Sequence, residues 1–241
     1  DEASAALEGG VRLGAPDPRD GGTSLPDPKE QARHHWAFRP VTKPALPAVR
    51  RTGWARNPID RFVLAGLEAH GLEPSPSADR RTLLRRASLV LTGLAPTWEE
   101  IVAFEADARP DAFEREVDRL LASPRYGARW ARHWVDVARY ADTKGYVFEE
   151  ERRYPYAYTY RDYVIAAFND DKPYDRFLME QIAADRLVAQ AGEAADRSVL
   201  AAMGFLTLGR RFLNNPHDII DDRIDVLMRG TMALTVGCAR C

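Results

Sequence analysis

The two cysteines carry the sharpest chemical signal in this chain. Cys238 and Cys241 form a Cys-x-x-Cys at the end of the 241 residues, and no other cysteine is present. Two thiols at this spacing can add to the two vinyl groups of a haem, whose iron is then held by a His directly after the second Cys. The same spacing also fits a redox dithiol, half of a zinc site or a local disulfide. A disulfide framework in the rest of the chain is excluded.

The surroundings of the pair weigh against two of these alternatives without eliminating them. A thioredoxin-like dithiol normally lies near a βαβ unit, and the sequence has no convincing alternating strand. A structural zinc site needs a second pair of ligands, and none accompanies the two cysteines. The residue that follows Cys241 in the parent protein would decide between haem attachment and the other readings.

Acid–base chemistry has its best candidates on a helix rich in tryptophan. His133, Asp136 and Tyr140 are spaced i, i+3 and i+7, and a His beside a carboxylate can be an oriented base or an iron ligand. The alternative is a structural polar network beside Trp130 and Trp134, which we favour because no nucleophile accompanies the group. With two further acids, the candidate catalytic residues are His133, Asp136, Asp142 and Asp185.

Three aspartates on the last predicted helix, Asp218, Asp222 and Asp225, form another candidate site. Their i, i+4, i+7 spacing could bind a hard cation, but such sites usually need further oxygen ligands. We favour a solvated face on which Asp225 pairs with Arg229.

Aromatic and sulfur side chains offer weaker candidates. A tyrosine cluster could form a sugar-binding platform, although core and loop packing is the commoner use of such rings. Its members are Tyr146, Tyr154, Tyr156, Tyr158 and Tyr160. Met228 and Met232 could supply a thioether to iron, but methionine at helical spacing is more often core.

The elements that must position these residues are helices. Apolar residues recur at a helical period, and capping signals such as Asn57-Pro58, Thr97-Trp98-Glu99-Glu100 and Ser123-Pro124 precede them. We predict an all-α, irregular multi-helix domain. Its expected helices run over 57–71, 79–91, 97–104, 110–121, 123–142, 160–168, 174–187, 198–208 and from 215 towards the cysteines. On the helix from 123, the predicted buried stripe is Trp130, Trp134, Val137 and Ala141.

The N-terminal part has a different character. Gly, Pro and Asp cluster before residue 30 and Pro recurs up to residue 47, which is typical of turns and extended linkers. We therefore predict an extended segment over 1–53, without regular structure over 9–33, and a helical domain over 54–241.

Composition bounds the function. Apolar residues make up 45% and charged residues 29%, which are ordinary globular values. The net charge of -2 gives no electrostatic reason to expect nucleic acid as a partner. No apolar run is long enough to span a membrane.

Three blocks carry a family resemblance: RYGARWARHWVDVARYADTKGY, YRDYVIAAFNDDKPYDRFLMEQIAADRL and DDRIDVLMRGTMALTVGCARC. Together they resemble the planctomycete cytochrome c family, large multidomain exported proteins with a module of otherwise unknown function that contains a Cys-x-x-Cys-His. The resemblance runs from about His35 to Cys241. VRLGAPDPR, near the N-terminus, is similar to the exit of the small cytochrome c module that precedes this one. Ala184 departs from the pattern, where Gly is expected before Asp185.

The resemblance implies covalent haem c on Cys238 and Cys241, with the iron-ligating His just beyond Cys241 and no metal ligand within the chain. It also implies export to the periplasm or cell envelope, electron transfer with redox partner proteins, and further domains of the same polypeptide as partners. We expect both ends to be cut inside larger units, so this chain as given should not carry haem. The alternative is the scaffold of an envelope enzyme or glycan-binding module in which haem or dithiol is accessory. Whether the domain is catalytic, and what supplies the second axial ligand, are left open.

Overall fold

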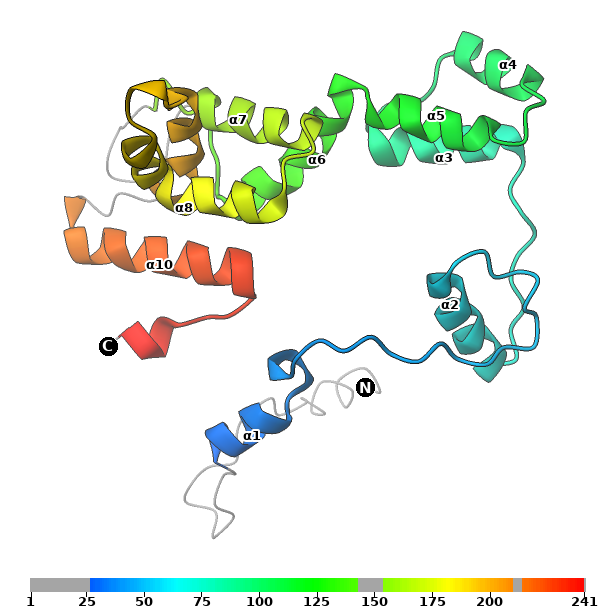
Figure 1. Ribbon diagram of the computed structural model, residues 1–241, viewed down its shortest axis with the longest axis horizontal. Coiled ribbons are helices and arrows are strands. Elements are labelled where there is room, and N and C mark those ends of the chain that lie inside the picture. The colour runs from blue at the N-terminus through cyan, green and yellow to red at the C-terminus, as the bar shows by residue number, and fades with distance from the viewer. Residues whose placement is uncertain (1–26, 143–153, 210–213, 241) are drawn as a thin grey trace, which may run out of the picture. The chain divides into compact units, whose positions relative to one another are not determined.

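The fold is all-α, as the sequence predicts. The computed structural model describes residues 27–142, 154–209 and 214–240, and within these ranges it contains helices and no strand (Figure 1). Among the helices of these ranges, none is long and apolar enough to cross a membrane. The chain divides into two compact units, residues 1–75 and 76–241.

The first unit begins, in its described part, with a short helix that the sequence analysis did not predict. Helix α1 (Pro28–His34) is capped by Asp27, whose side chain accepts from the Lys29 N–H at 2.9 Å. Glu30 pairs with Arg33 and His34 one turn later, which favours a helix despite the surrounding prolines. The expected lack of regular structure over 9–33 is therefore wrong for its last six residues. Residues 9–26 lie outside the described ranges.

Helix α2 (Pro58–Ala69) forms the core of this unit and follows the 3₁₀ turn η2 (Trp36–Phe38). The predicted cap at Asn57 is confirmed as a capping box with Asp60, and Leu64 is fully buried. Glu68 accepts the backbone N–H groups of Arg50 and Arg51 at 3.0 and 3.2 Å, which ties the proline-rich segment to the helix. The units divide between residues 75 and 76, within the irregular segment 72–79, whereas the sequence predicts a boundary near residue 53.

Three helices begin the second unit: α3 (Arg80–Leu91), α4 (Trp98–Ala106) and α5 (Ala112–Leu121). Figure 1 shows α3 and α5 side by side. The predicted capping box at Thr97 is confirmed, with Glu100 closing it in both directions. Leu84, Phe104 and Ala112 form a small core of their own.

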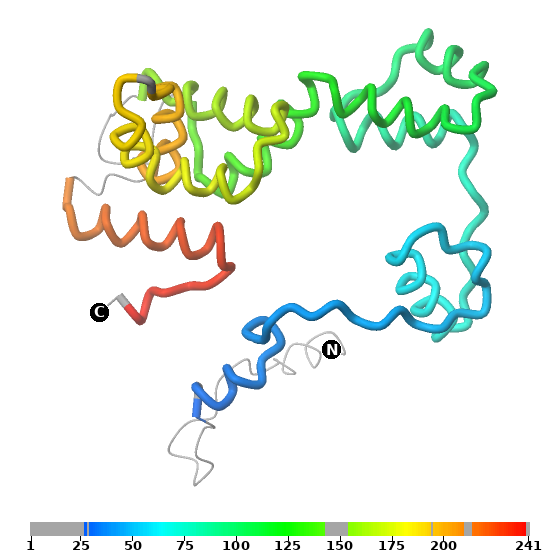
Figure 2. The backbone as a smooth tube through the Cα atoms, viewed as in Figure 1, coloured from blue at the N-terminus to red at the C-terminus, as the bar shows by residue number. Residues whose placement is uncertain are grey.

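The larger core belongs to the helices that follow. They are α6 (Pro124–Val137), α7 (Tyr158–Asn169), α8 (Tyr174–Ala191), the short turns η3 (Gly192–Ala194) and η4 (Arg197–Met203), α9 (Gly204–Thr207) and α10 (Pro216–Met232). Figure 2 shows the chain reversing between α7 and α8. Tyr160, Val164, Phe177, Phe205 and Val226 are buried together, so α7, α8, α9 and α10 all contribute to one core.

Two predicted elements differ from the structure. Helix α6 ends at Val137 rather than near Asp142, because Arg139 adopts a left-handed backbone with φ 57°. Its buried residues are Gly127 and Ala131, and Ala138 directly after the helix is buried too. Trp134 packs against the core that contains Ala131 and Ala138, while Val137 is 41% exposed. The predicted helix over 198–208 is mostly the 3₁₀ turn η4 followed by one turn of α-helix.

Candidate functional site

The cysteine segment follows directly from α10. Asn215 caps this helix by accepting from the His217 N–H at 3.0 Å, and the helix ends where Ala233 adopts a left-handed backbone with φ 54°. The short 3₁₀ turn η6 (Gly237–Arg240) then carries Cys238, a free cysteine whose side chain is exposed. Cys241 lies outside the described residues. The first thiol is thus accessible to a reactant in solution.

Helix α10 is anchored by a contact that the sequence analysis missed. Asp222 pairs with the guanidinium of Arg139, the residue with left-handed backbone after α6. Gly209 is buried beside this pair, and a Cβ there would lie 2.5 Å from Asp222 Oδ2 and 2.7 Å from Arg139 Nη2. Because this spacing excludes any side chain, Gly209 permits the ion pair that holds α10 against the end of α6.

The three aspartates of α10 do not converge on a metal site. Asp225 pairs with Arg229 at 2.7 Å, which confirms the predicted ion pair, and Asp218 accepts from Asn215 Nδ2 at 2.9 Å. No group of three or more His, Cys, Asp or Glu in the described part of the chain could hold a metal ion.

The four candidate catalytic residues are all exposed. His133 is exposed with its ring 5.5 Å from that of Trp130, and Asp136 and Asp185 are exposed as well. Asp142 accepts from the Tyr140 hydroxyl at 2.6 Å and pairs with Arg161 at 2.8 Å. Burial, together with this hydrogen bond, raises the pKa of Tyr140 to about 12.

The end of α6 also shows why Tyr140 does not share the face of His133 and Asp136. Tyr140 was placed on the face of His133 and Asp136 by helical spacing, but α6 ends three residues before it. The contacts among the described residues join no two of His133, Asp136, Asp142 and Asp185.

The predicted tyrosine cluster is divided among different environments. Tyr160 is buried, Tyr154 donates to the Gly209 carbonyl at 3.4 Å, and Tyr156 is 73% exposed. Tyr146 lies outside the described residues. Tyr154, Tyr156 and Tyr160 nevertheless line one pocket of about 260 Å³, so these three members share a surface although their exposure differs.

A hydrogen-bonded group lies in the centre of the larger core. Trp134 Nε1 donates to Gln181 Oε1 at 2.7 Å, and the Tyr160 hydroxyl donates to the same oxygen at 2.7 Å. Tyr160 and Gln181 are essentially fully buried, and burial raises the pKa of Tyr160. The signal that could have revealed this group is Gln181 itself, since it lies between Phe177 and Ala184 on the buried face of α8.

A buried carboxylate lies one residue earlier. The side chain of Glu180 is 3% exposed and accepts from Lys172 Nζ at 2.5 Å, Arg176 Nε at 2.7 Å and the Tyr163 hydroxyl at 2.8 Å. Burial alone would raise the pKa of Glu180, but these hydrogen bonds outweigh it and the pKa is lowered. Glu180 is therefore ionised at neutral pH, and it joins α7, the turn after it and α8.

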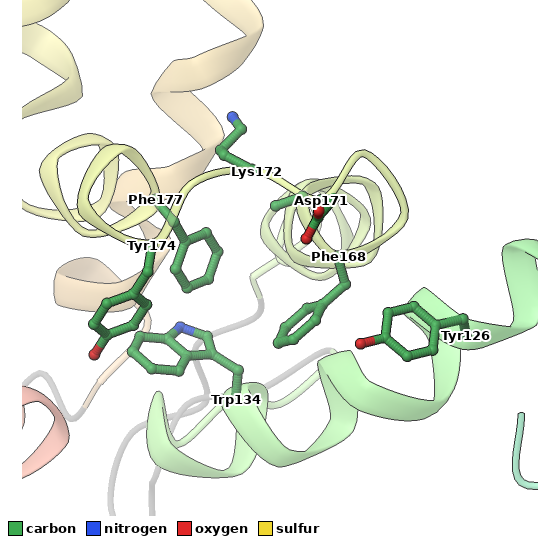
Figure 3. Close-up of a pocket in the computed structure, with 8 residues that line it drawn as sticks. Tyr126, Trp134, Phe168, Asp171, Lys172, Tyr174 and Phe177 are labelled. Atoms are coloured by element: carbon green, nitrogen blue, oxygen red, sulfur yellow. The ribbon is translucent and has the colours of Figure 1, made fainter. Parts of the chain in front are cut away.

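An aromatic pocket of about 220 Å³ opens on the other side of this turn (Figure 3). The rings that line it are those of Tyr126, Trp134, Phe168, Tyr174 and Phe177. Ala167, Asp171 and Lys172 complete the wall. Figure 3 shows the Lys172 side chain pointing away from the rings. The sequence analysis assigned no role to this set, which comes from α6, α7 and α8.

The turn between α7 and α8 places the charged rim of the pocket. The Lys172 N–H donates to the Ala167 carbonyl at 2.9 Å and the Asp171 N–H to the Phe168 carbonyl at 3.4 Å, which is a Schellman ending. Asp171 has φ 47° at the position where glycine is usual. Asp tolerates this conformation better than most residues, but still at a cost.

The fold and its contacts define a helical domain with a thiol-bearing C-terminal segment and a separate aromatic pocket. Residues 58–241 match the family PSCyt2, described as "Protein of unknown function (DUF1549)", and the chain belongs to this family. It is a planctomycete cytochrome-c-associated domain family, which agrees with the resemblance in the three sequence blocks. No curated protein and no solved structure matches the chain.

Proposed function

We propose that this chain is part of an exported c-type haem protein that transfers electrons, with haem attached covalently at Cys238 and Cys241. The observation that carries the proposal is the Cys-x-x-Cys in a chain whose family is associated with cytochromes c. The exposure of Cys238 is compatible with this role, because a thiol must be accessible to react with a haem vinyl group.

The roles of the residues follow from this chemistry. Each thiol would add across one vinyl group to form a thioether, and these two bonds would fix the porphyrin to the segment after α10. When bound, the haem would supply a one-electron redox centre. The family pattern places the proximal His directly after Cys241, so this chain contributes the attachment sulfurs and not that ligand.

Anchoring of the segment supports the proposal from a second direction. Val226 is buried in the larger core and Asp222 is paired with Arg139, so α10 is held six and ten residues before it ends. Cys238 follows only six residues after Met232. A haem attached there would remain close to the helical domain.

The test is to express a longer version of the parent, including the residues after Cys241, together with a haem-maturation system. A matched variant carries Cys238→Ser and Cys241→Ser. Mass spectrometry should show one haem mass on the first protein and none on the second, and reduced spectra should show the same difference. The chain ending at Cys241 should remain without haem.

If the longer protein keeps its unmodified mass while a control cytochrome matures in the same cells, the haem proposal is wrong. The dithiol, zinc and accessory alternatives would then take its place.

A further inference from the structure

The aromatic pocket beside the α7–α8 turn is lined mainly by rings, and its hydroxyl groups are those of Tyr126 and Tyr174. The Trp134 N–H already donates to Gln181 and Tyr160, at 2.7 and 3.1 Å. That indole is also fixed by Phe177 at 5.0 Å, in an edge arrangement, and by Phe205 at 5.6 Å. Its orientation is therefore set by the core, before any ligand enters.

The charges at the rim are not equivalent. Lys172 is bound to Glu180 at 2.5 Å and lies 4.8 Å from the centre of the Tyr163 ring, away from the pocket. The Asp171 carboxylate is exposed and has no side-chain partner within the described part of the chain. The positive group at this rim is thus neutralised inside the protein, and the negative group is not.

The surrounding turn strengthens this polarity. Residues 170–175 contain three aspartates and one lysine. The backbone of Asp171 is left-handed, a conformation that glycine would adopt without cost. A strained residue at the rim of a pocket is a pattern found at binding sites, and here that residue carries a carboxylate that lines the aromatic pocket.

These features select among ligand classes. Aromatic faces carry negative potential and attract cations, most strongly when the cation is shielded from water. A sugar would bring several hydroxyl groups, and the pocket offers them few free polar partners. A phosphate would meet the unpaired carboxylate. A bare metal ion would need several oxygen ligands. An alkylated ammonium group needs only ring faces and one negative charge.

We propose that this pocket binds a small organic cation of the trimethylammonium class, with the rings of Trp134, Phe168 and Tyr174 around the methyl groups and Asp171 opposite the charge. The volume of about 220 Å³ is below that of drug-sized pockets, which suits a compact head group. This site is independent of the proposed haem attachment, because its residues lie on α6, α7, α8 and the turn between α7 and α8.

The test uses the purified 241-residue chain and choline chloride in isothermal titration calorimetry, at constant ionic strength set with potassium chloride. The matched probe is 3,3-dimethylbutan-1-ol, which has the same shape as choline without its charge. Choline should bind at least about tenfold more tightly than the neutral alcohol, the ratio expected for a partly desolvated cation on aromatic rings.

Four variants separate the contributions of charge and ring. Asp171→Asn removes the charge and keeps a residue type that accepts the left-handed backbone, so it should weaken choline binding several-fold without changing the melting temperature. Asp170→Asn removes a neighbouring exposed charge that does not line the pocket, so it is the control and should weaken binding much less than Asp171→Asn. Tyr174→Leu should weaken binding, whereas Tyr174→Phe retains the ring and should preserve it.

Two outcomes would overturn the proposal. Equal affinity for choline and the neutral alcohol would make the pocket simply apolar. Absence of choline binding would exclude a cation site, and binding of a methyl glucoside in its place would favour a sugar site. If choline binds, the next measurement is co-sedimentation of the chain with phosphatidylcholine vesicles. Co-sedimentation that free choline abolishes would identify the ligand as a lipid head group. If the chain does not co-sediment, the ligand is a soluble cation.

Discussion

Glu180 provides the sharpest test of how the α7–α8 region is held together. Its carboxylate is 3% exposed and accepts three hydrogen bonds, from Lys172, Arg176 and Tyr163. The perturbation is Glu180→Gln, which preserves shape but removes the charge and turns an NH₂ group towards two cations. Removing one partner of a buried ion pair costs about 3–5 kcal/mol, because the remaining charge is left without compensation.

The expected cost of Glu180→Gln is lower than for a fully buried ion pair, because both cationic partners of Glu180 are partly exposed. The side chains of Lys172 and Arg176 are 22% and 47% exposed, so both can recover part of their hydration in the variant. We therefore expect Glu180→Gln to lower the free energy of unfolding by about 2–3 kcal/mol at pH 7. Glu193→Gln, at an exposed carboxylate, is the control and should change it by less than about 0.5 kcal/mol.

The effect should depend on pH in one direction. The pKa of Glu180 is lowered from its ordinary value of 4.5, so the ionised form is favoured by folding. Its contribution is complete above the pKa of the unfolded chain and is lost as the pH falls through the lower folded value. The difference between the unmodified chain and Glu180→Gln should therefore be constant at neutral pH and shrink below pH 4.5.

The assay is urea unfolding followed by far-ultraviolet circular dichroism at several pH values between 7 and 3. A difference below about 0.5 kcal/mol at pH 7 would show that the buried carboxylate contributes no more than a surface group. A large difference that persists unchanged at pH 3 would show that the cost arises from packing and not from the charge.

Two further substitutions test the core around Tyr160. Trp134→Ala should lower the free energy of unfolding by about 3–5 kcal/mol, because the indole packs on Phe177 and Phe205 and donates a hydrogen bond to Gln181. A loss below about 1 kcal/mol would show that the face of α6 carrying Trp134 lies in solvent. Gly204→Ala should lower the free energy of unfolding by about 1–3 kcal/mol, because the new Cβ would lie 2.5 Å from the Tyr160 Cβ. The control is Gly66→Ala, where nothing lies within 4 Å and no loss of stability is expected.

Much of the helical architecture could be predicted from short stretches of sequence. The caps at Asn57, Thr97, Ser123 and Asn215 each depend on a hydrogen bond to a residue two or three positions away. Such interactions form wherever the local pattern occurs, so the helix starts that follow these four residues were predicted correctly. The Asp225–Arg229 pair is local in the same way and was also predicted.

Helix ends that depend on distant contacts were predicted less well. The apolar pattern of α6 continues past Val137, but Arg139 leaves the helix and pairs with Asp222, 83 residues later in the chain. The 3₁₀ turn η4, whose local pattern predicts an α-helix, packs against α7 and α8. Neither feature is recorded in the local pattern.

The cysteine pair was found from spacing alone, because its chemistry depends on two thiols a fixed distance apart along the chain. The Glu180 group and the aromatic pocket are different. In the sequence Glu180 looks like an ordinary surface residue one turn after Arg176, and Trp134 and Tyr174 look like unrelated aromatic residues. Only the reversal between α7 and α8, packed against α6, buries the first and brings the other two to one pocket. Local hydrogen bonds and periodicity determine where helices form, whereas burial and pocket formation depend on which helix faces meet.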